Sequence, residues 1–246
     1  MSILQSIFQQ KKLNQKGLAV LIDPDQHGDI TNHIFSLSQK LNIDLFLVGG
    51  SLLSAGITQK CVSDLKKLGA KNVILFPGNE IQLCDEADAI LFMSLISGRN
   101  AEFLIGKQVV AAPWIKNSGI ETIPTGYMLV DSGNITSALY MSGTLPLPNN
   151  KPDIAAATAL AGQYLGMQLL YMDAGSGAQN AVNPQLIQAV SQNSSCILFV
   201  GGGIKTAEQA TLAWENGADF IVVGNGVFEN THILEELANA LTLFNK

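Results

Sequence analysis

Short apolar runs recur along the chain, and each ends at a glycine, a proline or a polar residue. Neighbouring positions within a run are apolar, with no alternation of apolar and polar residues. The runs therefore indicate strands that are buried on both faces, as in a parallel sheet. They predict eight strands, at 18–22, 45–48, 73–76, 89–93, within 122–130, and at 169–172, 198–200 and 220–223.

Helical periodicity fills most of the segments between these runs. A short amphipathic helix is expected near residues 3–8, before the first strand. Further helices are predicted at 29–41, 57–68, 101–112, 154–165 and 185–192, from the N-cap Thr206 to the C-cap Gly217, and at 233–243. Strands and helices thus alternate along all 246 residues. This order predicts the α/β class and a modified (β/α)₈ TIM barrel, formed as a single domain over 1–246.

Two links depart from the regular alternation. Only residues 79–88 separate the third strand from the fourth, so we expect the barrel helix after strand three to be shortened or replaced by a loop. A gap of this kind could open the flank of the barrel to a long apolar ligand. The longest irregular stretch, 134–151, follows strand five, and long loops in compact barrels are usually lids or binding loops.

Glycine-rich turns follow two neighbouring strands, at 201–203 after strand seven and at 224–226 after strand eight. Exposed backbone N–H groups in such turns can hold a phosphate, helped by the partial positive charge of a following helix N-terminus. The same two strands carry the usual phosphate site of the (β/α)₈ barrel. The alternative is that these glycines only make tight turns between strand and helix.

Composition restricts the possible functions. Hydrophobic residues make up 47% of the chain and charged residues 14%, and the net charge is −6 with no basic run, which argues against nucleic-acid binding. Any anionic substrate must then be held by local groups. The three cysteines show no metal-type spacing and indicate reduced thiols in a cytoplasmic protein. No signal-peptide pattern and no apolar run of membrane-spanning length is present.

Polar side chains at the strand ends are the candidate functional groups: Asp23, Asp25, Ser51, Arg99, Asp131, Asp173, Ser176 and Asn225. No triad of a nucleophile with histidine and acid stands at the strand ends, which disfavours nucleophilic hydrolysis. The set fits a hard cation such as Mg²⁺, held by one or two protein oxygens and by substrate phosphates. Simpler roles remain open: Asp25 and Ser51 can cap helices, and Arg99 can be a solvated loop charge.

Six motifs in this order resemble the geranylgeranylglyceryl phosphate synthase family, whose bacterial relatives include heptaprenylglyceryl phosphate synthases. The motifs are IDPDQ (22–26), VGGS (48–51), SGRNAEFLIG (97–106), YMDAGSGA (171–178), FVGGGIK (199–205) and VVGNGVFE (222–229). The resemblance extends from the first strand to the last. It implies a prenyltransferase that joins sn-glycerol 1-phosphate to geranylgeranyl diphosphate, forming an ether-lipid precursor and releasing diphosphate.

The resemblance also implies roles for individual residues. Mg²⁺ would be bound by Asp23 and Ser51, and the catalytic residues would be Asp23, Tyr171 and Asp173. Arg99 is a candidate contact for the prenyl diphosphate. The glycerol phosphate would be held by Tyr171, Met172, Asp173, Ala174, Gly175, Ser176, Gly177, Gly202, Gly203, Gly224 and Asn225.

The chain departs from the family at two positions. Asp173 stands where the family usually has the longer Glu, and Leu21 stands where some relatives have a lysine that contacts phosphate. The sequence does not fix the length of the prenyl chain, for which Ala111, Ala112 and Trp114 are candidate determinants, although Trp114 is more often a core residue. A homo-oligomer is expected from the high apolar content.

Two other functions remain open. The first is an isomerase or lyase acting on a phosphorylated, sugar-like substrate, for which Asp23 and Asp131 could imitate an acid–base pair, although no lysine stands at a strand end to support it. The second is a catalytically inactive phosphate-binding barrel. A long apolar groove would favour the prenyl substrate, whereas a small closed polar pocket would favour the isomerase.

Overall fold

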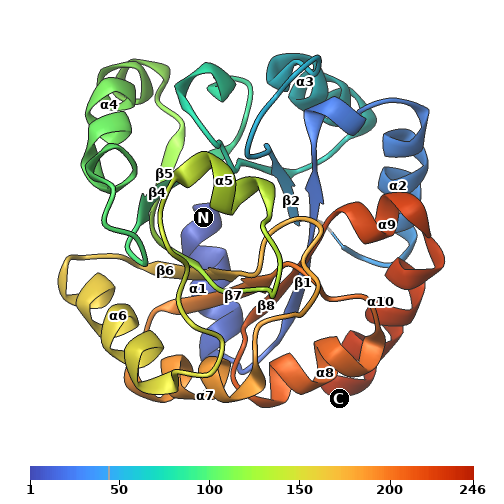
Figure 1. Cartoon of the computed structure of the whole chain (residues 1–246). Coiled ribbons are helices and arrows are strands. Elements are labelled where there is room, and N and C mark those ends of the chain that lie inside the picture. Colours follow the sequence, from blue (N-terminus) through green and yellow to red (C-terminus); the bar gives the residue numbers. More distant parts are fainter. Residues whose placement is uncertain (44) are drawn as a thin grey trace.

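Eight parallel strands close into a barrel in sequence order (Figure 1). The computed structural model describes residues 1–43 and 45–246, and for Asn225 it describes the backbone alone. The strands are β1 (Gly17–Ile22), β2 (Leu45–Val48), β3 (Asn72–Leu75), β4 (Ala89–Leu95), β5 (Glu121–Leu129), β6 (Leu169–Asp173), β7 (Ile197–Gly201) and β8 (Phe220–Val223). β1 pairs with β8, with Gly17 opposite Phe220, and closes the ring. The predicted α/β barrel is confirmed.

Helices surround the barrel on the outside (Figure 1). The long ones that follow strands are α2 (Asp29–Lys40), α3 (Thr58–Leu68), α4 (Lys107–Ser118), α6 (Pro152–Tyr164), α7 (Pro184–Asn193), α8 (Ala207–Glu215) and α10 (His232–Phe244). Shorter elements are α1 (Ile3–Lys12), the 3₁₀ turns η1 (Pro24–Gln26) and η2 (Glu80–Gln82), the π-helical turn η3 (Glu102–Gly106), α5 (Ser137–Ser142) and α9 (Asn225–Glu229). None of the helices in the described ranges is both long and apolar enough for a bilayer crossing.

The link between β3 and β4 is the single 3₁₀ turn η2, as the short spacing predicted. The prediction for the following helix was wrong in detail. The helix expected at 101–112 begins as the π-helical turn η3 and continues as α4 through Pro113 to Ser118. Its C-cap is Gly119 in the left-handed conformation (φ 73°), so the glycine ends the helix and the proline does not.

The stretch 134–151, expected to be irregular, contains the short helix α5. The Thr136 side chain accepts a hydrogen bond from the backbone N–H of Leu139, and Gly143 closes the helix with a left-handed φ of 58°. Trp114, expected in the core, is 36% exposed because the extension of α4 carries it onto the helix surface.

Strand residues alternate between two hydrophobic layers. Leu169 and Tyr171 of β6 point into the barrel, whereas Leu170 and Met172 pack between the barrel and the helices. Five aromatic rings contact one another in sequence inside the barrel, from Phe76 through Tyr127, Tyr171 and Phe199 to Phe220. The barrel is therefore a packed core and not a pore.

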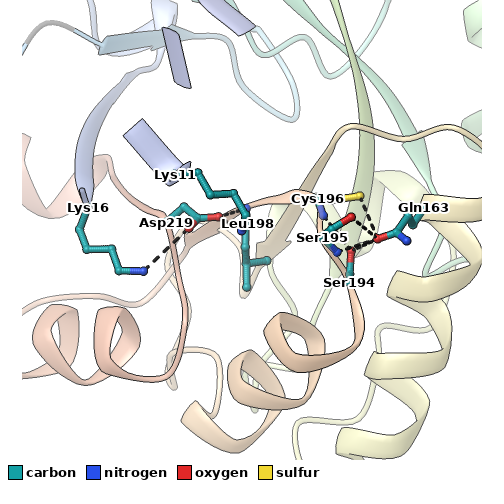
Figure 2. Close-up of polar contacts among 8 residues, drawn as sticks. All are labelled: Lys11, Lys16, Gln163, Ser194, Ser195, Cys196, Leu198 and Asp219. Atoms are coloured by element: carbon teal, nitrogen blue, oxygen red, sulfur yellow. Dashed lines mark hydrogen bonds and ion pairs between the residues drawn. The ribbon is translucent and has the colours of Figure 1, made fainter. Parts of the chain in front are cut away.

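Helix α1 packs on the barrel at the amino-terminal ends of the strands. Its Ile7 is 3% exposed and belongs to the interior cluster. The buried carboxylate of Asp219 accepts from the Lys11 Nζ at 2.6 Å and from the backbone N–H of Leu198 at 2.8 Å (Figure 2). The Lys16 ammonium lies 3.8 Å from the other carboxylate oxygen, and burial lowers the pKa of this lysine. Asp219 thus joins α1 to β7.

We predict that Asp219→Ala lowers the free energy of unfolding by about 2–4 kcal/mol. The change leaves the buried N–H of Leu198 without its acceptor and the two lysines without their counter-charge. Urea unfolding measures the effect. Glu235→Ala, which removes an exposed contact to His232, is the control and should change stability by less than about 0.5 kcal/mol. Equal effects of the two substitutions would contradict the assigned role of Asp219.

Candidate active site

A cavity of about 330 Å³ lies at the carboxyl-terminal ends of the strands, the end of a TIM barrel where chemistry occurs. Its polar end is formed by Asp23, Ser51, Asp173 and Ser176. From there it extends over the interior residues and out between η2 and α4, where the missing helix leaves room. We call this extension the apolar groove, and its lining includes Phe76, Leu83, Ile90, Leu91, Phe92, Met93, Leu95, Phe103, Ala111, Ile115 and Met141.

Short helix α5 contributes to both ends of the cavity. Ser137, Ala138 and Met141 line the cavity, and Thr136 packs against Gly175 of the turn after β6. In Figure 1 this helix lies across the centre of the barrel. The loop after β5 therefore forms part of the cavity wall, and its role as a lid or binding loop stays a prediction.

Asp173 is the acidic group held most firmly in the site. Its Oδ1 accepts from the backbone N–H of Gly175 at 2.7 Å, and its Oδ2 accepts from the Tyr127 hydroxyl at 2.6 Å. Burial raises the pKa of this carboxyl, while the two hydrogen bonds act in the opposite direction because they favour the charged form. Asp173 is therefore a carboxylate of increased basicity that faces the cavity.

Tyr127 is a site residue that the sequence reasoning missed. It lines the cavity, holds Asp173 and lies opposite Tyr171 in the β5–β6 register. Burial and the nearby charge of Asp173 raise its pKa well above the usual value, so it stays a hydrogen-bond donor. The available signal was a second tyrosine on the neighbouring strand, but only the pairing register brings it to Asp173.

Tyr171 lies below the cavity wall. It is 1% exposed, stacks on Phe76 with ring centroids 5.0 Å apart, and is not among the residues that line the cavity. Its predicted direct contact with substrate stays a prediction. Met172 and Ala174 are fully buried in the layer between barrel and helices, so they can offer a ligand only their backbone groups.

The glycine turns after β6 and β7 lie against each other beside Asp173, and Ser176 is their member that lines the cavity. Gly175, Gly177, Gly202 and Gly203 all have left-handed φ angles, between 73° and 89°. A Cβ on Gly202 would lie 2.5 Å from the backbone N of Gly175 and 2.6 Å from Asp173 Oδ1, so only glycine fits there. Gly224 precedes α9, and the side chain of Asn225 lies outside the described residues. These turns are the candidate phosphate site.

Asp23 and Ser51 both line the cavity, on the loops after β1 and β2. Asp23 is partly buried, which raises its pKa, and its Oδ1 accepts from the backbone N–H of Asp25 at 3.0 Å. A Cβ on Gly50 would lie 3.2 Å from both carboxylate oxygens, so the glycine leaves the space beside them open. Within the described residues, no group of three or more His, Cys, Asp or Glu side chains could hold a metal. One carboxylate and one hydroxyl fit Mg²⁺ only together with oxygens from a ligand.

Three other predicted groups lie away from the cavity. The Asp25 carboxylate accepts from the backbone N–H groups of residues 54–56, and these bonds hold its pKa well below the usual range. The Arg99 guanidinium is exposed and donates to the backbone oxygen of Gly98 at 2.7 Å. Asp131 is also exposed and accepts from Gly133. An isomerase would need Asp23 and Asp131 as an acid–base pair. Asp131 does not line the cavity, and the two aspartates that do are Asp23 and Asp173.

Fold and site together define a (β/α)₈ barrel with a cavity that joins an acidic polar end to an apolar groove, next to the candidate phosphate turns. The chain belongs to the PcrB family, which matches residues 11–241. It is 48% identical over 243 residues to the geranylgeranylglyceryl phosphate synthase of Spirosoma linguale, covering 98% of each chain. It is 38% identical to the enzyme of the same name from Thermococcus kodakarensis over 245 residues, covering 99% of this chain and 96% of the relative.

Solved structures agree with the family. The (S)-3-O-geranylgeranylglyceryl phosphate synthase of Thermoplasma acidophilum, in complex with sn-glycerol-1-phosphate, superposes with a TM-score of 0.91 at 30% identity and covers 100% of this chain and 99% of its own. The tryptophan synthase alpha chain of Legionella pneumophila superposes with a TM-score of 0.61 at 17% identity, covering 98% of each chain, and shares the fold alone. The resemblance seen in the sequence motifs is confirmed.

We predict that Gly202→Ala weakens binding of inorganic phosphate at least about tenfold. The added Cβ would push Asp173 and the turn after β6 apart, and φ 77° is itself strained for alanine. Isothermal titration with phosphate measures the effect. Gly28→Ala is the matched control, because no atom lies within 4 Å of its Cβ and its φ of 168° is extended. Phosphate affinity that is unchanged in a folded Gly202→Ala protein would contradict the assigned phosphate site.

Proposed function

We propose that this protein is a prenyltransferase that joins sn-glycerol 1-phosphate to geranylgeranyl diphosphate, releasing diphosphate and forming geranylgeranylglyceryl phosphate. The observation that carries the proposal is the composition of the single cavity described above. Its polar end is formed by Asp23, Ser51, Asp173 and Ser176 of the turn after β6, and its other end is the apolar groove. The family membership and the named relatives support the same reaction.

Each substrate has a matching part of the cavity. The phosphate of glycerol phosphate fits the turns after β6, β7 and β8, where backbone N–H groups and glycines leave room for an anion. The prenyl chain fits the apolar groove, where burial of its hydrocarbon is favourable. The diphosphate then lies between them, near Asp23 and Ser51. A sugar-phosphate isomerase would leave the groove without a ligand.

The reaction forms one C–O bond, breaks another and transfers one proton. The C3 hydroxyl oxygen of glycerol phosphate attacks C1 of the prenyl chain, and the C1–O bond to diphosphate breaks with its electron pair leaving on the diphosphate. The hydroxyl proton passes to the Asp173 carboxylate, whose basicity burial increases. Tyr127 keeps this carboxylate oriented through its 2.6 Å hydrogen bond.

Asp23 and Ser51 are the residues that would hold Mg²⁺, because their oxygens and the adjacent space at Gly50 suit a hard cation that keeps ligand oxygens in its shell. When bound, the ion neutralises charge on the leaving diphosphate. Arg99 is a weaker proposal for diphosphate binding, since its guanidinium contacts backbone oxygens outside the cavity.

Two further expectations stay proposals. A homo-oligomer is supported by exposed apolar side chains on η3 and α4, where Ile105, Val109 and Val110 are each at least 60% exposed. A cytoplasmic location is supported by the three cysteines, which are free and buried.

A product assay tests the proposed reaction. Labelled sn-glycerol 1-phosphate, Mg²⁺ and a series of prenyl diphosphates are incubated with the protein, and lipid products are separated. We expect a prenylglyceryl phosphate with geranylgeranyl diphosphate, and preferences across the series report the fit of the groove. A folded wild-type protein that makes no product with any chain length would refute the reaction.

We predict that Asp23→Asn reduces the Mg²⁺-dependent rate at least about a hundredfold while the circular dichroism spectrum is retained.

We predict that Tyr127→Phe moves the acidic limb of the pH–rate profile to higher pH by about one unit. The Tyr127 hydrogen bond favours the charged form of Asp173, so its loss raises the pKa of that carboxyl further. A larger fraction of Asp173 is then protonated at any given pH near the pKa, and the base is lost at a higher pH than in the wild type. Tyr164→Phe, at an exposed side chain on α6, is the control. An acidic limb that does not move in Tyr127→Phe would show that Asp173 is not the titrating base.

A further inference from the structure

Gln82 is a fully buried polar side chain on η2, the single turn that replaces a barrel helix. A buried amide costs free energy unless all its groups find hydrogen-bond partners. No sequence motif singles out this residue, and it does not line the cavity itself. Its surroundings show what the side chain does.

The carboxamide of Gln82 makes three hydrogen bonds to two loops. Its Oε1 accepts from the backbone N–H of Gly50 at 3.2 Å and from that of Gly78 at 3.2 Å. Its Nε2 donates to the carbonyl oxygen of Gly50 at 2.8 Å. Both backbone polar groups of Gly50 are thus bound to one side chain, in the manner of a strand neighbour.

Gly50 lies between this clamp and the proposed metal site. On one side, its Cα faces Asp23, since a Cβ there would lie 3.2 Å from both carboxylate oxygens. On the other side, its carbonyl packs so closely on Gly78 that a Cβ on Gly78 would lie 2.4 Å from that oxygen. The next residue is Ser51. The orientation of the Gly50 backbone therefore sets where the Ser51 hydroxyl stands relative to Asp23.

Few other bonds hold this turn. Gly49 donates to the carbonyl oxygen of Ile22 at 3.1 Å, but its φ of 156° and the adjacent Gly50 make the segment conformationally permissive. A turn of two glycines loses much conformational entropy when it is ordered. Without a clamp, a ligand that needs Ser51 opposite Asp23 would have to supply this ordering on binding.

We propose that Gln82 is a positioning residue that fixes the Gly50 backbone, and with it Ser51 opposite Asp23, so that the diphosphate end of the site is formed before the substrate binds. The inference rests on the proposed function, because that function assigns the prenyl diphosphate to Asp23 and Ser51. Gln82 does not touch substrate, and it acts through Gly50.

The test variant is Gln82→Met, which keeps the length of the side chain and removes all three hydrogen bonds. We expect the dissociation constant for inorganic diphosphate in the presence of Mg²⁺, measured by isothermal titration, to rise about tenfold, equivalent to about 1.4 kcal/mol. The dissociation constant for sn-glycerol 1-phosphate should stay within about twofold. In turnover, KM for the prenyl diphosphate should rise more than kcat falls.

Gln82→Glu is the second variant, and it tests the same inference if Gln82→Met does not fold. It retains acceptors for the N–H groups of Gly50 and Gly78, and it replaces the donor to the Gly50 carbonyl by a carboxylate oxygen that repels that carbonyl. We expect its diphosphate affinity to fall by at least about threefold. Gln163→Met is the matched control, because Gln163 also clamps a loop with its carboxamide, accepting from Ser194, Ser195 and Cys196 (Figure 2). That clamp lies outside the cavity, so its loss should lower stability and leave both affinities unchanged.

Two results would overturn the inference. One is an unchanged diphosphate affinity in a folded Gln82 variant, and the other is an equal loss of diphosphate and glycerol phosphate affinity, which would indicate general damage to the barrel. A wild-type protein that does not bind diphosphate would also overturn it, since no site would then exist for Gln82 to form. The proposed function fails separately, in the wild-type product assay, which contains no Gln82 variant.

Discussion

The site depends on the thirteen residues between β3 and β4, which form no crossover helix. A parallel connection normally needs a dozen or more residues and covers the flank of the sheet with a helix. Here one 3₁₀ turn makes the connection, and the space that a helix would fill becomes the apolar groove between η2 and α4. Because no α-helix stands between β3 and β4, the loops after β2 and β3 are not packed against one at this flank of the barrel. The Gln82 carboxamide supports them through backbone bonds to Gly50 and Gly78.

Asp173 connects the phosphate turn with the aromatic interior of the barrel. Asp173 receives its two hydrogen bonds from Gly175, within the phosphate turn, and from Tyr127, whose ring belongs to the interior aromatic cluster. A carboxylate at this depth is costly unless its oxygens are bonded, and both are. A Glu at this position would reach farther into the cavity. The shorter Asp173 is instead held back against the strand ends, where Tyr127 lies beside it on the cavity wall.

Features determined by local sequence were predictable, and features determined by pairing across the barrel were not. The continuous apolar runs predicted the eight strands, and the short spacing between β3 and β4 predicted that the helix there is missing. Local signals at Thr136 and Gly143 were present but went unused, so α5 was missed, and the helix expected to end at 112 continues to its C-cap Gly119. Tyr127 lies 46 residues from Asp173 and Gln82 lies 32 residues from Gly50, so no local pattern reveals these two contacts. The exposure of Trp114 follows from the phase of a longer α4.

The packed interior of the barrel has a consequence for the path of protons. Below Asp173, the rings of Tyr171, Phe199 and Phe220 fill the core, and each is less than 5% exposed. Farther down, α1 covers the strand ends. In the proposed reaction, a proton taken up by Asp173 would therefore return to solvent through the cavity that also holds the substrates, because the carboxylate lies on the cavity wall above this packed interior. Deprotonation of Asp173 would then be kinetically coupled to product release. The carboxylate would regain its charged form only after the product has left the cavity.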